Sequence, residues 1–392
     1  MSESLEQHLR EQLGDVRSRH LYRRRRVIEG AHGVQARVDG RDVTVFCSND
    51  YLGLATHPEL QAALVAAVRQ QGVGSGASQL VTGYNRAHRD LEEELAEYLE
   101  RPRALLLSSG YLANVGVISA LMGRGDVICS DRLNHASLID GMRLSHADVR
   151  RYAHADMADL RRQLDGQPGR RRMIVSDGVF SMDGDVAPLA ELAATGRAQD
   201  AWLLVDDAHG LGVLGPQGRG AVAEAGLGLD EVPILMATLG KSLGAAGAFV
   251  AGSEALIESL IQSTRTFIFS TAPPPAVAEA ARKGLQLIRE ETWRREHLHS
   301  LVGYFREAAA RLGLPLAESR TPIQPLILGE ESVALAVSEK LLQSGYLVTA
   351  IRPPTVPRGT ARLRITLSAA HDEQEVDGLL EALGAALESR AA

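Results

Sequence analysis

The sequence predicts an α/β fold in which a mostly parallel sheet is covered by helices, with a smaller α+β domain at the C-terminus. The first observation is that short apolar runs alternate with helical patterns from residue 50 onward. Strands that are repeatedly separated by helices pair in parallel and are buried on both faces. The second is a change of pattern after the break Pro273–Pro275, where a long helical stretch replaces this alternation. We therefore expect a helical arm and short hairpin over residues 1–48, a large domain over 49–280 and a small domain over 281–392.

The N-terminal segment predicts a helical arm followed by a hairpin. Residues 1–30 are amphipathic and end in the basic run Arg23–Arg26. After Gly30, valines alternate with other residues on either side of Asp39-Gly40, a dipeptide typical of tight hairpins. A basic run can contact nucleic acid. We favour a solvated helix end or an anion contact, because the whole chain is acidic.

The large domain is predicted to alternate helices with strands. A proline occupies the first turn of the helix expected over 58–68, and apolar side chains recur on one helical face over 87–99. Apolar runs that end at Gly, Asp or Ser predict strands at 103–107, 126–129, 173–176, 202–205, 233–237 and 246–251.

The small domain is predicted to mix both element types. A helical pattern extends over 276–312. Beyond it, the patterns predict strands at 323–328, 346–351 and 361–367 and helices at 331–344 and 372–388.

Composition excludes several classes of function. The 392 residues carry 42 Lys and Arg against 49 Asp and Glu, a net charge of −7, whereas a general nucleic-acid binder carries a basic excess. No apolar run reaches the roughly 18 residues of a membrane helix, and the N-terminus lacks the apolar stretch of a secretory signal. Cys47 and Cys129 fit neither a disulfide framework nor the spacing of metal ligands. We expect a cytoplasmic enzyme without a metal and without a nucleic-acid or membrane partner.

Lys241 is the first candidate for chemistry. The chain has three lysines, and Lys283 and Lys340 lie in charged helical patterns where an exposed side chain is the natural interpretation. Lys241 instead follows an apolar strand and lies in the Gly-flanked turn Thr238–Gly244. An amine in such a turn contacts a phosphate, forms a Schiff base, or has a purely structural role.

The second candidate is the acidic end of a strand. The run Trp202–Val205 leads directly into Asp206, Asp207 and His209. Ligands of α/β sheets bind at the carboxyl ends of the strands. A carboxylate there can hold magnesium, a ribose or a protonated pyridine nitrogen, or it can cap a helix.

Two clusters of glycine and serine form the third candidate, Gly72–Ser78 and Ser108–Asn114. The second lies between an expected strand and a helical run, where free N–H groups at a helix N-terminus can bind a phosphate. Neither cluster matches a dinucleotide or nucleoside-triphosphate motif. A phosphate site, an aspartate and a later lysine together indicate pyridoxal phosphate, because its ring nitrogen needs an acid and its aldehyde needs an amine.

The chain resembles the α-oxoamine synthases, a family of fold-type I pyridoxal-phosphate enzymes, over about residues 20–388. The motifs that carry the resemblance occur in this order: Ser48–Leu54, Gly74–Ser78, Asp131–Ser137, Asp177–Gly184, Val205–Gly210 and Thr238–Lys241. The resemblance implies a seven-stranded sheet and a homodimer whose active sites lie at the subunit interface.

The resemblance also implies which residues bind the cofactor ring. Lys241 would bind the aldehyde and act as acid and base at the amino acid's α-carbon. Asp206 would pair with the pyridine nitrogen, His209 and Ser181 would bond the phenolic oxygen, and His135 would stack on the ring.

For the phosphate, the resemblance implies two backbone N–H groups, those of Gly110 and Tyr111, and the hydroxyl of Thr238. Ser270 and Thr271 would reach the phosphate of the neighbouring subunit. These residues complete the set that the resemblance assigns to cofactor binding.

For the substrates, Asn49 and Arg364 would hold the amino-acid carboxylate, and Thr355 would lie near the acyl group. Arg23, with Arg352 second, is the candidate for the distal end of that acyl group. The segment 350–357 resembles most closely the members that condense L-alanine with a pimeloyl thioester of acyl carrier protein or coenzyme A.

Two alternatives remain open. Glycine C-acetyltransferase, or another member of the family, shares nearly all the implied cofactor residues. A non-enzymatic binding protein on the same fold would use the run Arg23–Arg26 on nucleic acid, but it leaves Lys241 and Asp206 without a role.

Overall fold

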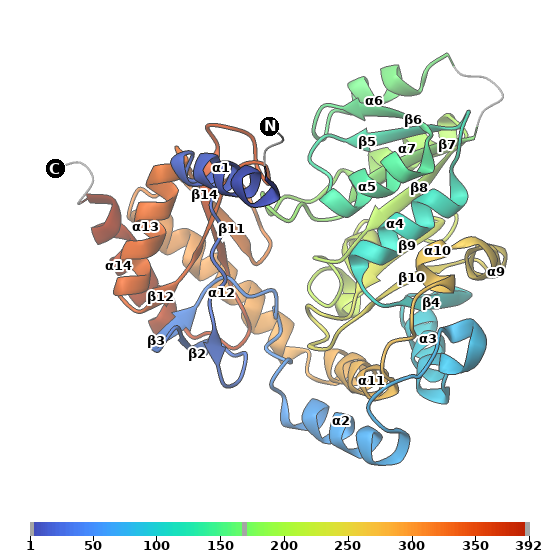
Figure 1. Ribbon diagram of the computed structural model, residues 1–392, viewed down its shortest axis with the longest axis horizontal. Helices are drawn as coiled ribbons and strands as arrows, with labels where there is room; N and C mark the ends of the chain where they lie inside the picture. Colours follow the sequence, from blue (N-terminus) through green and yellow to red (C-terminus); the bar gives the residue numbers. More distant parts are fainter. Residues whose placement is uncertain (1–3, 167–170, 389–392) are drawn as a thin grey trace. The chain divides into compact units, whose positions relative to one another are not determined.

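The computed structural model describes residues 4–166 and 171–388. Contacts divide the chain into two compact units (Figure 1). The large unit comprises Asp50–Ser181 and Asp185–Glu296. The small unit comprises Met1–Asn49, Met182–Gly184 and His297–Ala392. The division thus groups the two ends of the chain in one unit, and the three consecutive domains expected from the sequence stay a prediction.

A seven-stranded sheet forms the centre of the large unit, in the order β4-β10-β9-β8-β7-β5-β6. The neighbouring strands from β9 to β6 all pair in parallel, and β10 runs antiparallel to both β4 and β9. The strands are β4 (Arg103–Leu107), β5 (Val127–Asp131), β6 (Asp148–Tyr152), β7 (Arg172–Asp177), β8 (Ala201–Asp206), β9 (Ile234–Thr238) and β10 (Ala248–Gly252). The predicted, mostly parallel sheet is confirmed.

Strand β6 is the strand of the large sheet that the sequence did not predict. Its five residues, Asp148-Val-Arg-Arg-Tyr152, contain no apolar run, and the strand lies at the edge of the sheet. Only Tyr152 of its five residues is buried, so this strand needs fewer apolar side chains.

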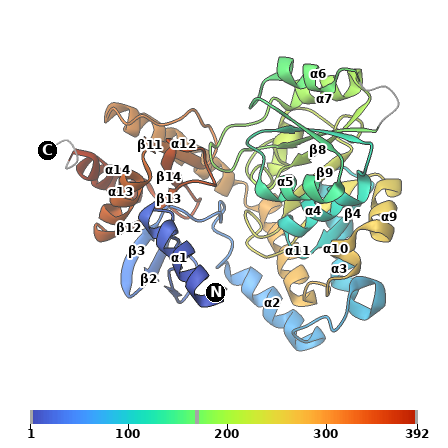
Figure 2. The same cartoon turned by 45° about the horizontal axis from the view of Figure 1, so that its top comes forward.

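Helices cover both faces of this sheet. On one face, Leu105, Ile128, Val175 and Met236 pack in one core cluster with α4, α5, α9 and α10. Figures 1 and 2 show α4 and α5 side by side there. Strand residues of the opposite parity are buried as well, because α3, α6 and α7 contact the strands. The helices of this unit are α2 (Pro58–Gln71), α3 (Arg86–Tyr98), α4 (Gly110–Leu121), α5 (Ala136–Ser145), α6 (Met157–Leu164), α7 (Leu189–Ala198), α8 (Ala221–Glu224), α9 (Glu254–Ser263), α10 (Arg265–Ile268) and α11 (Pro275–Glu290).

The small unit contains two sheets, in the orders β1-β2-β3-β12 and β11-β14-β13. The predicted hairpin is confirmed, since β2 and β3 pair antiparallel across Asp39 and Gly40, both with positive φ. Its strands are β1 (Ile28–Glu29), β2 (Gln35–Val38), β3 (Arg41–Val45), β11 (Ile323–Gly329), β12 (Tyr346–Leu347), β13 (Thr349–Ile351) and β14 (Ala361–Thr366). Its helices are α1 (Leu5–Ser18), α13 (Glu331–Gln343) and α14 (Glu373–Glu388), while α12 (Trp293–Arg311) starts in the large unit.

Two predicted elements were wrong in extent. The single helix expected over 276–312 is two helices, α11 and α12, because Glu291 leaves helical backbone angles at the C-cap of α11. No glycine or proline marks this break in the sequence. The strand expected over 346–351 is divided at Val348, because β12 pairs with β3 and β13 pairs with β14.

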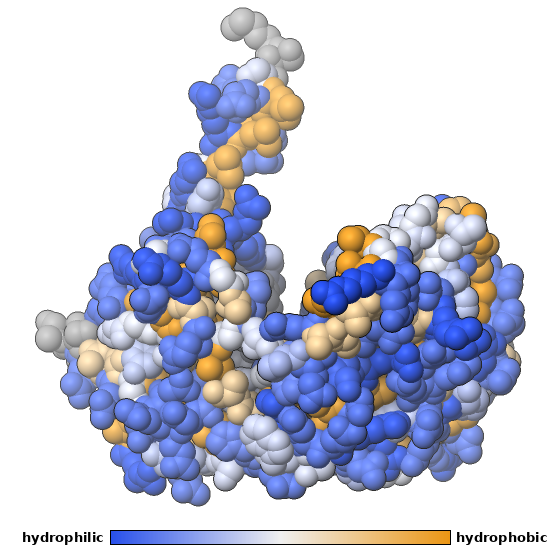
Figure 3. All heavy atoms as spheres, turned by 90° about the horizontal axis from the view of Figure 1, so that it is seen from below, coloured by the Kyte–Doolittle hydropathy of each residue, from blue (hydrophilic) through white to orange (hydrophobic). Residues whose placement is uncertain are grey.

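Helix α1 is shorter than the arm expected over 1–30, and none of its residues, all of them described, is buried. Leu5, Leu9 and Leu13 recur every four residues and remain exposed. Figure 3 shows apolar surface, in orange, along the slender projection at its top. Within the described residues, no helix is long and apolar enough to cross a membrane. No group of three or more His, Cys, Asp or Glu residues could hold a metal ion in that part of the chain.

Candidate active site

The carboxyl ends of the parallel strands bring polar side chains together at one edge of the large sheet. Asp131 ends β5, Asp177 ends β7, Asp206 ends β8 and Thr238 ends β9. Most residues of these strands are apolar and buried, and these polar groups lie where the strands end.

Lys241 lies in the turn that follows β9. Its Nζ is 2.8 Å from Nε2 of His209, and Nδ1 of His209 is 2.6 Å from the hydroxyl of Tyr51. Gly244 closes the turn with a positive φ, and a Cβ on it would approach the backbone of Leu54 to 2.6 Å. The turn that carries Lys241 therefore packs directly on the segment that carries Tyr51.

Asp206 is buried and accepts two hydrogen bonds. Nδ2 of Asn114 donates to it at 2.7 Å, and the backbone N–H of Ala208 donates at 3.0 Å. Asn114 also donates to Ser137 at 2.9 Å. The amide of Asn114 thus fixes the orientation of the carboxylate.

His135 lies at the N-cap of α5, beside Asp206. Its ring Nδ1 is 2.7 Å from Oγ of Ser137, and its backbone N–H donates to Asp177 at 2.7 Å. Surrounding protein lowers the pKa of His135 by desolvation; the charge of Asp206 opposes this effect and that of Lys241 adds to it. The ring is nevertheless exposed, so a planar group can stack on it.

The residues implied for the phosphate are also close to one another. A Cβ at Gly110 would lie 2.7 Å from Cγ2 of Thr238, so a side chain at position 110 would displace Thr238. Gly110 starts α4, whose first N–H groups carry a partial positive charge. The hydroxyl of Thr238 is buried and has no hydrogen-bond partner among the described residues. A buried hydroxyl beside a helix N-terminus fits a phosphate.

Ser181, Ser270 and Thr271 lie elsewhere in the large unit. Ser181 lies in the turn 179–186, whose ends pair as an antiparallel bridge. Thr271 pairs with Ser78 through another such bridge, which joins the 270–271 segment to the predicted Gly72–Ser78 cluster. The role of Ser181 at the cofactor ring and that of Ser270 and Thr271 toward a second subunit stay predictions.

The residues implied for the substrates belong to the small unit. Arg364 is buried and donates to Oδ1 of Asn49 at 3.1 Å and to Thr366 at 3.2 Å. This contact brings a guanidinium and an amide together, a pair suited to a carboxylate.

A pocket of about 240 Å³ brings Arg23, Arg352 and Thr355 together, with Arg24 beside them. Burial lowers the pKa of Arg352, and the neighbouring charge of Arg23 lowers it further. Arg26 instead forms ion pairs with Asp39 and Glu339, each at 3.5 Å. The structure therefore separates Arg26 from Arg23 and Arg24, which line the pocket.

Sequence reasoning did not single out Tyr51, Asn114 or Ser137, although each lies within a motif that it quoted. Tyr51 lies within Ser48–Leu54, and its partner His209 is 158 residues away. Hydrogen bonds over such separations leave no periodic signal in one sequence.

Comparisons with known proteins agree with this geometry. Residues 41–383 match the family model of aminotransferase class I and II. The 8-amino-7-oxononanoate synthase of Nitrosococcus oceani is 60% identical over 363 residues, which cover 93% of this chain and 96% of that protein.

Solved structures agree as well. A serine palmitoyltransferase from S. paucimobilis with bound PLP–myriocin superposes with a TM-score of 0.93 at 28% identity, covering 98% of both chains. The 8-amino-7-oxononanoate synthase of Francisella tularensis superposes with a TM-score of 0.78 at 31% identity, covering 89% of this chain and 99% of that one. The chain belongs to the aminotransferase class I and II family, and within it to the 8-amino-7-oxononanoate synthases.

Proposed function

We propose that this protein condenses L-alanine with a pimeloyl thioester, with loss of carbon dioxide, to give 8-amino-7-oxononanoate. It is a pyridoxal-phosphate-dependent acyltransferase. The observation that carries the proposal is the contact between Lys241 and His209 beside the buried Asp206, at the carboxyl ends of parallel strands.

The residues present fit pyridoxal phosphate. Asp206 would hold the ring nitrogen, His135 the ring face, and Thr238 with the N-terminus of α4 the phosphate. When bound, the cofactor withdraws electrons from the amino acid's α-carbon, which makes the α-proton acidic. Lys241 would bind the aldehyde and move that proton, because His209 holds its amine in one place.

The small unit supplies groups suited to the carboxylate of L-alanine and to the distal carboxylate of the pimeloyl chain. Arg364 and Asn49 would bind the carboxylate of L-alanine. The pocket of Arg23, Arg352 and Thr355 would bind the distal carboxylate, or its ester, of the pimeloyl chain. The thioester carrier is acyl carrier protein or coenzyme A.

Assembly and location belong to the same proposal. We propose a homodimer with Ser270 and Thr271 reaching the neighbouring subunit's phosphate, since symmetric dimers are the commonest oligomers. We also propose that the enzyme works in the cytoplasm.

The test is the visible spectrum of the purified protein together with product analysis. We expect an absorbance band near ~420 nm, changed by L-alanine more than by glycine or serine, and 8-amino-7-oxononanoate as product. Lys241→Ala should abolish the band. Lys283→Ala is the matched control, because Lys283 bonds Glu59 and Gln286 on the exposed surface.

Two results would contradict the proposal. A protein that stays colourless with added pyridoxal phosphate would reject the cofactor site. A spectrum that responds to glycine and not to alanine would mean that the amino-acid substrate is glycine, as for glycine C-acetyltransferase.

A further inference from the structure

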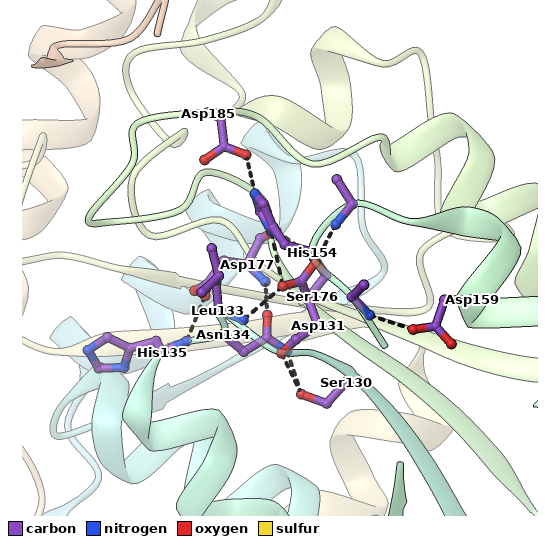
Figure 4. A network of polar contacts seen from close by, with 12 residues as sticks. Ser130, Asp131, Leu133, Asn134, His135, His154, Asp159, Ser176, Asp177 and Asp185 are labelled. Carbon is purple, nitrogen blue, oxygen red and sulfur yellow. Dashed lines mark hydrogen bonds and ion pairs between the residues drawn. The ribbon is translucent and has the colours of Figure 1, made fainter. Parts of the chain in front are cut away.

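His154 lies between two carboxylates, and no role in the site has yet been given to it (Figure 4). Nδ1 of its ring is 3.1 Å from both carboxylate oxygens of Asp131, and Nε2 is 2.8 Å from Oδ2 of Asp185. Ala153, the residue before it, donates its backbone N–H to Asp159 at 2.8 Å, which anchors this segment to α6.

The geometry determines the protonation state of the ring. A carboxylate only accepts hydrogen bonds, and a neutral imidazole has one N–H donor and one acceptor. Because each ring nitrogen faces a carboxylate, both nitrogens must donate, and His154 is an imidazolium. Burial alone would lower the pKa of His154, but the hydrogen bonds and charges of Asp131 and Asp185 raise it to about 10.

On one side, this cation holds the loop that carries His135. The Asp131 carboxylate also accepts the backbone N–H of Leu133 at 2.8 Å. Asn134 accepts the backbone N–H of Asp177 at 3.0 Å, and Asp177 in turn accepts the backbone N–H of His135 at 2.7 Å. These contacts form one connected network from the His154 ring to the backbone of His135 (Figure 4).

On the other side, the cation holds the turn 179–186, which carries Ser181. Asp185 accepts the ring N–H of His154 and also accepts, through its carbonyl, the backbone N–H of Phe180 at 2.9 Å. The Phe180 ring meets the His154 ring edge-on, with centroids 4.4 Å apart. Phe180 and Asp185, which lie on either side of Ser181 in the chain, therefore both contact His154.

We propose that His154 is a positioning residue: its imidazolium ties the loop of His135 to the turn of Ser181 and so sets the width of the cofactor ring site. The proposal rests on the proposed function for the roles of His135 and Ser181. Ionisable groups that face the ring are Asp131 from β5 and Asp185 from the turn.

The test compares full-length His154→Gln, Asp185→Asn and the double variant with the wild-type protein. Glutamine offers one donor group and one acceptor, so it cannot satisfy two carboxylates. His297→Gln is the matched control, since His297 also bonds through its ring, at 2.9 Å from the carbonyl of His371 in the small unit. The readouts are the dissociation constant of pyridoxal phosphate, the circular dichroism of the bound cofactor in the visible range, and the thermal unfolding of the cofactor-free protein.

We expect each single variant to weaken cofactor binding by about tenfold, the loss of one charge-assisted hydrogen bond, and to reduce the visible dichroism. The double variant should bind pyridoxal phosphate no more weakly than the single variant with the larger loss of affinity, because both changes break the same link. His297→Gln should keep wild-type values. If His154→Gln fails to fold, Asp185→Asn still gives the same readouts, because this carboxyl is partly exposed.

Two results would overturn the proposal. One is a His154→Gln protein with a lower unfolding temperature but unchanged cofactor affinity and dichroism, as a purely structural histidine would give. The other is a nitrogen NMR spectrum of the wild-type protein at pH 7 in which either ring nitrogen of His154 lacks its proton. The second measurement needs no cofactor, so it tests this link even where a colourless wild-type protein has already rejected the proposed function.

Discussion

Nζ of Lys241 lies 2.8 Å from Nε2 of His209, and the opposite nitrogen of that ring lies 2.6 Å from the hydroxyl of Tyr51. The imidazole is therefore held at both ends, with the reactive amine on one side and a buried phenol on the other. A ring fixed in this way keeps one tautomer. Its Nε2 can accept a hydrogen bond from the amine of Lys241 while its Nδ1 donates one to the hydroxyl oxygen of Tyr51.

Tyr51→Phe should lower kcat by about tenfold, because the phenyl ring keeps the packing but leaves Nδ1 of His209 without its buried partner, a loss of about 1.4 kcal/mol. The measurement is the pH profile of kcat with L-alanine, which should also shift as the tautomer of His209 is released. Tyr304→Phe is the control, since its hydroxyl bonds Asp377 on the exposed surface of the small unit. An unchanged kcat and pH profile would show that Tyr51 does not orient His209.

We predict different effects on kcat for substitutions at the two neighbouring aspartates. Asp206→Asn should lower kcat by at least about a thousandfold, roughly 4 kcal/mol, because an amide cannot hold a proton on the ring nitrogen. Asp207→Asn should change kcat little, since this buried carboxyl faces the backbone N–H groups of Ala221 and Val222. Stopped-flow absorbance and steady-state rates on both variants check this. Equal losses would mean that Asp206 has no special part in the chemistry.

The residues of the site differ in whether the sequence could predict their position. Asp206 ends one apolar strand and Lys241 lies in the turn after another, so strand patterning alone predicted both at the ligand-binding edge. Tyr51 and Asn114 act on residues 158 and 92 positions away, and only the folded chain brings these groups together.

The same physical reasons explain the fold. Six strands of the large sheet were predictable because they are mostly buried and burial requires apolar runs, whereas β6 buries one of its five residues and has no such run. The break at Glu291 was not predictable, because no glycine or proline marks it in the sequence.

The raised pKa of Asp207 predicts how the free energy of unfolding depends on pH. Burial raises its pKa to about 8, from a value near 3.9 in the unfolded chain. Between these values the folded state binds one proton more than the unfolded state, so the free energy of unfolding falls by about 1.4 kcal/mol per pH unit as pH rises. The contribution is fully present below pH 3.9 and is lost as pH rises through 8. Urea unfolding of wild type and Asp207→Asn from pH 5 to pH 8 should show the two curves diverging in the variant's favour; parallel curves would contradict the raised pKa.

Arg352→Ala should raise the KM for the pimeloyl thioester by about tenfold and leave the KM for L-alanine unchanged. The guanidinium donates to backbone carbonyls of His20 and Tyr22. With Arg23 and Arg24, it gives the pocket three positive charges that would face the distal carboxylate. Losing one charge-assisted hydrogen bond costs about 1.4 kcal/mol, which corresponds to a tenfold change in KM.

Arg26→Ala is the control, because Arg26 forms ion pairs with Asp39 and Glu339. The decisive measurement is a pair of KM values for each variant with acyl chains that end in a carboxylate or in its methyl ester. If Arg352→Ala changed the KM for L-alanine instead, the basic pocket would belong to the amino-acid substrate and not to the acyl chain.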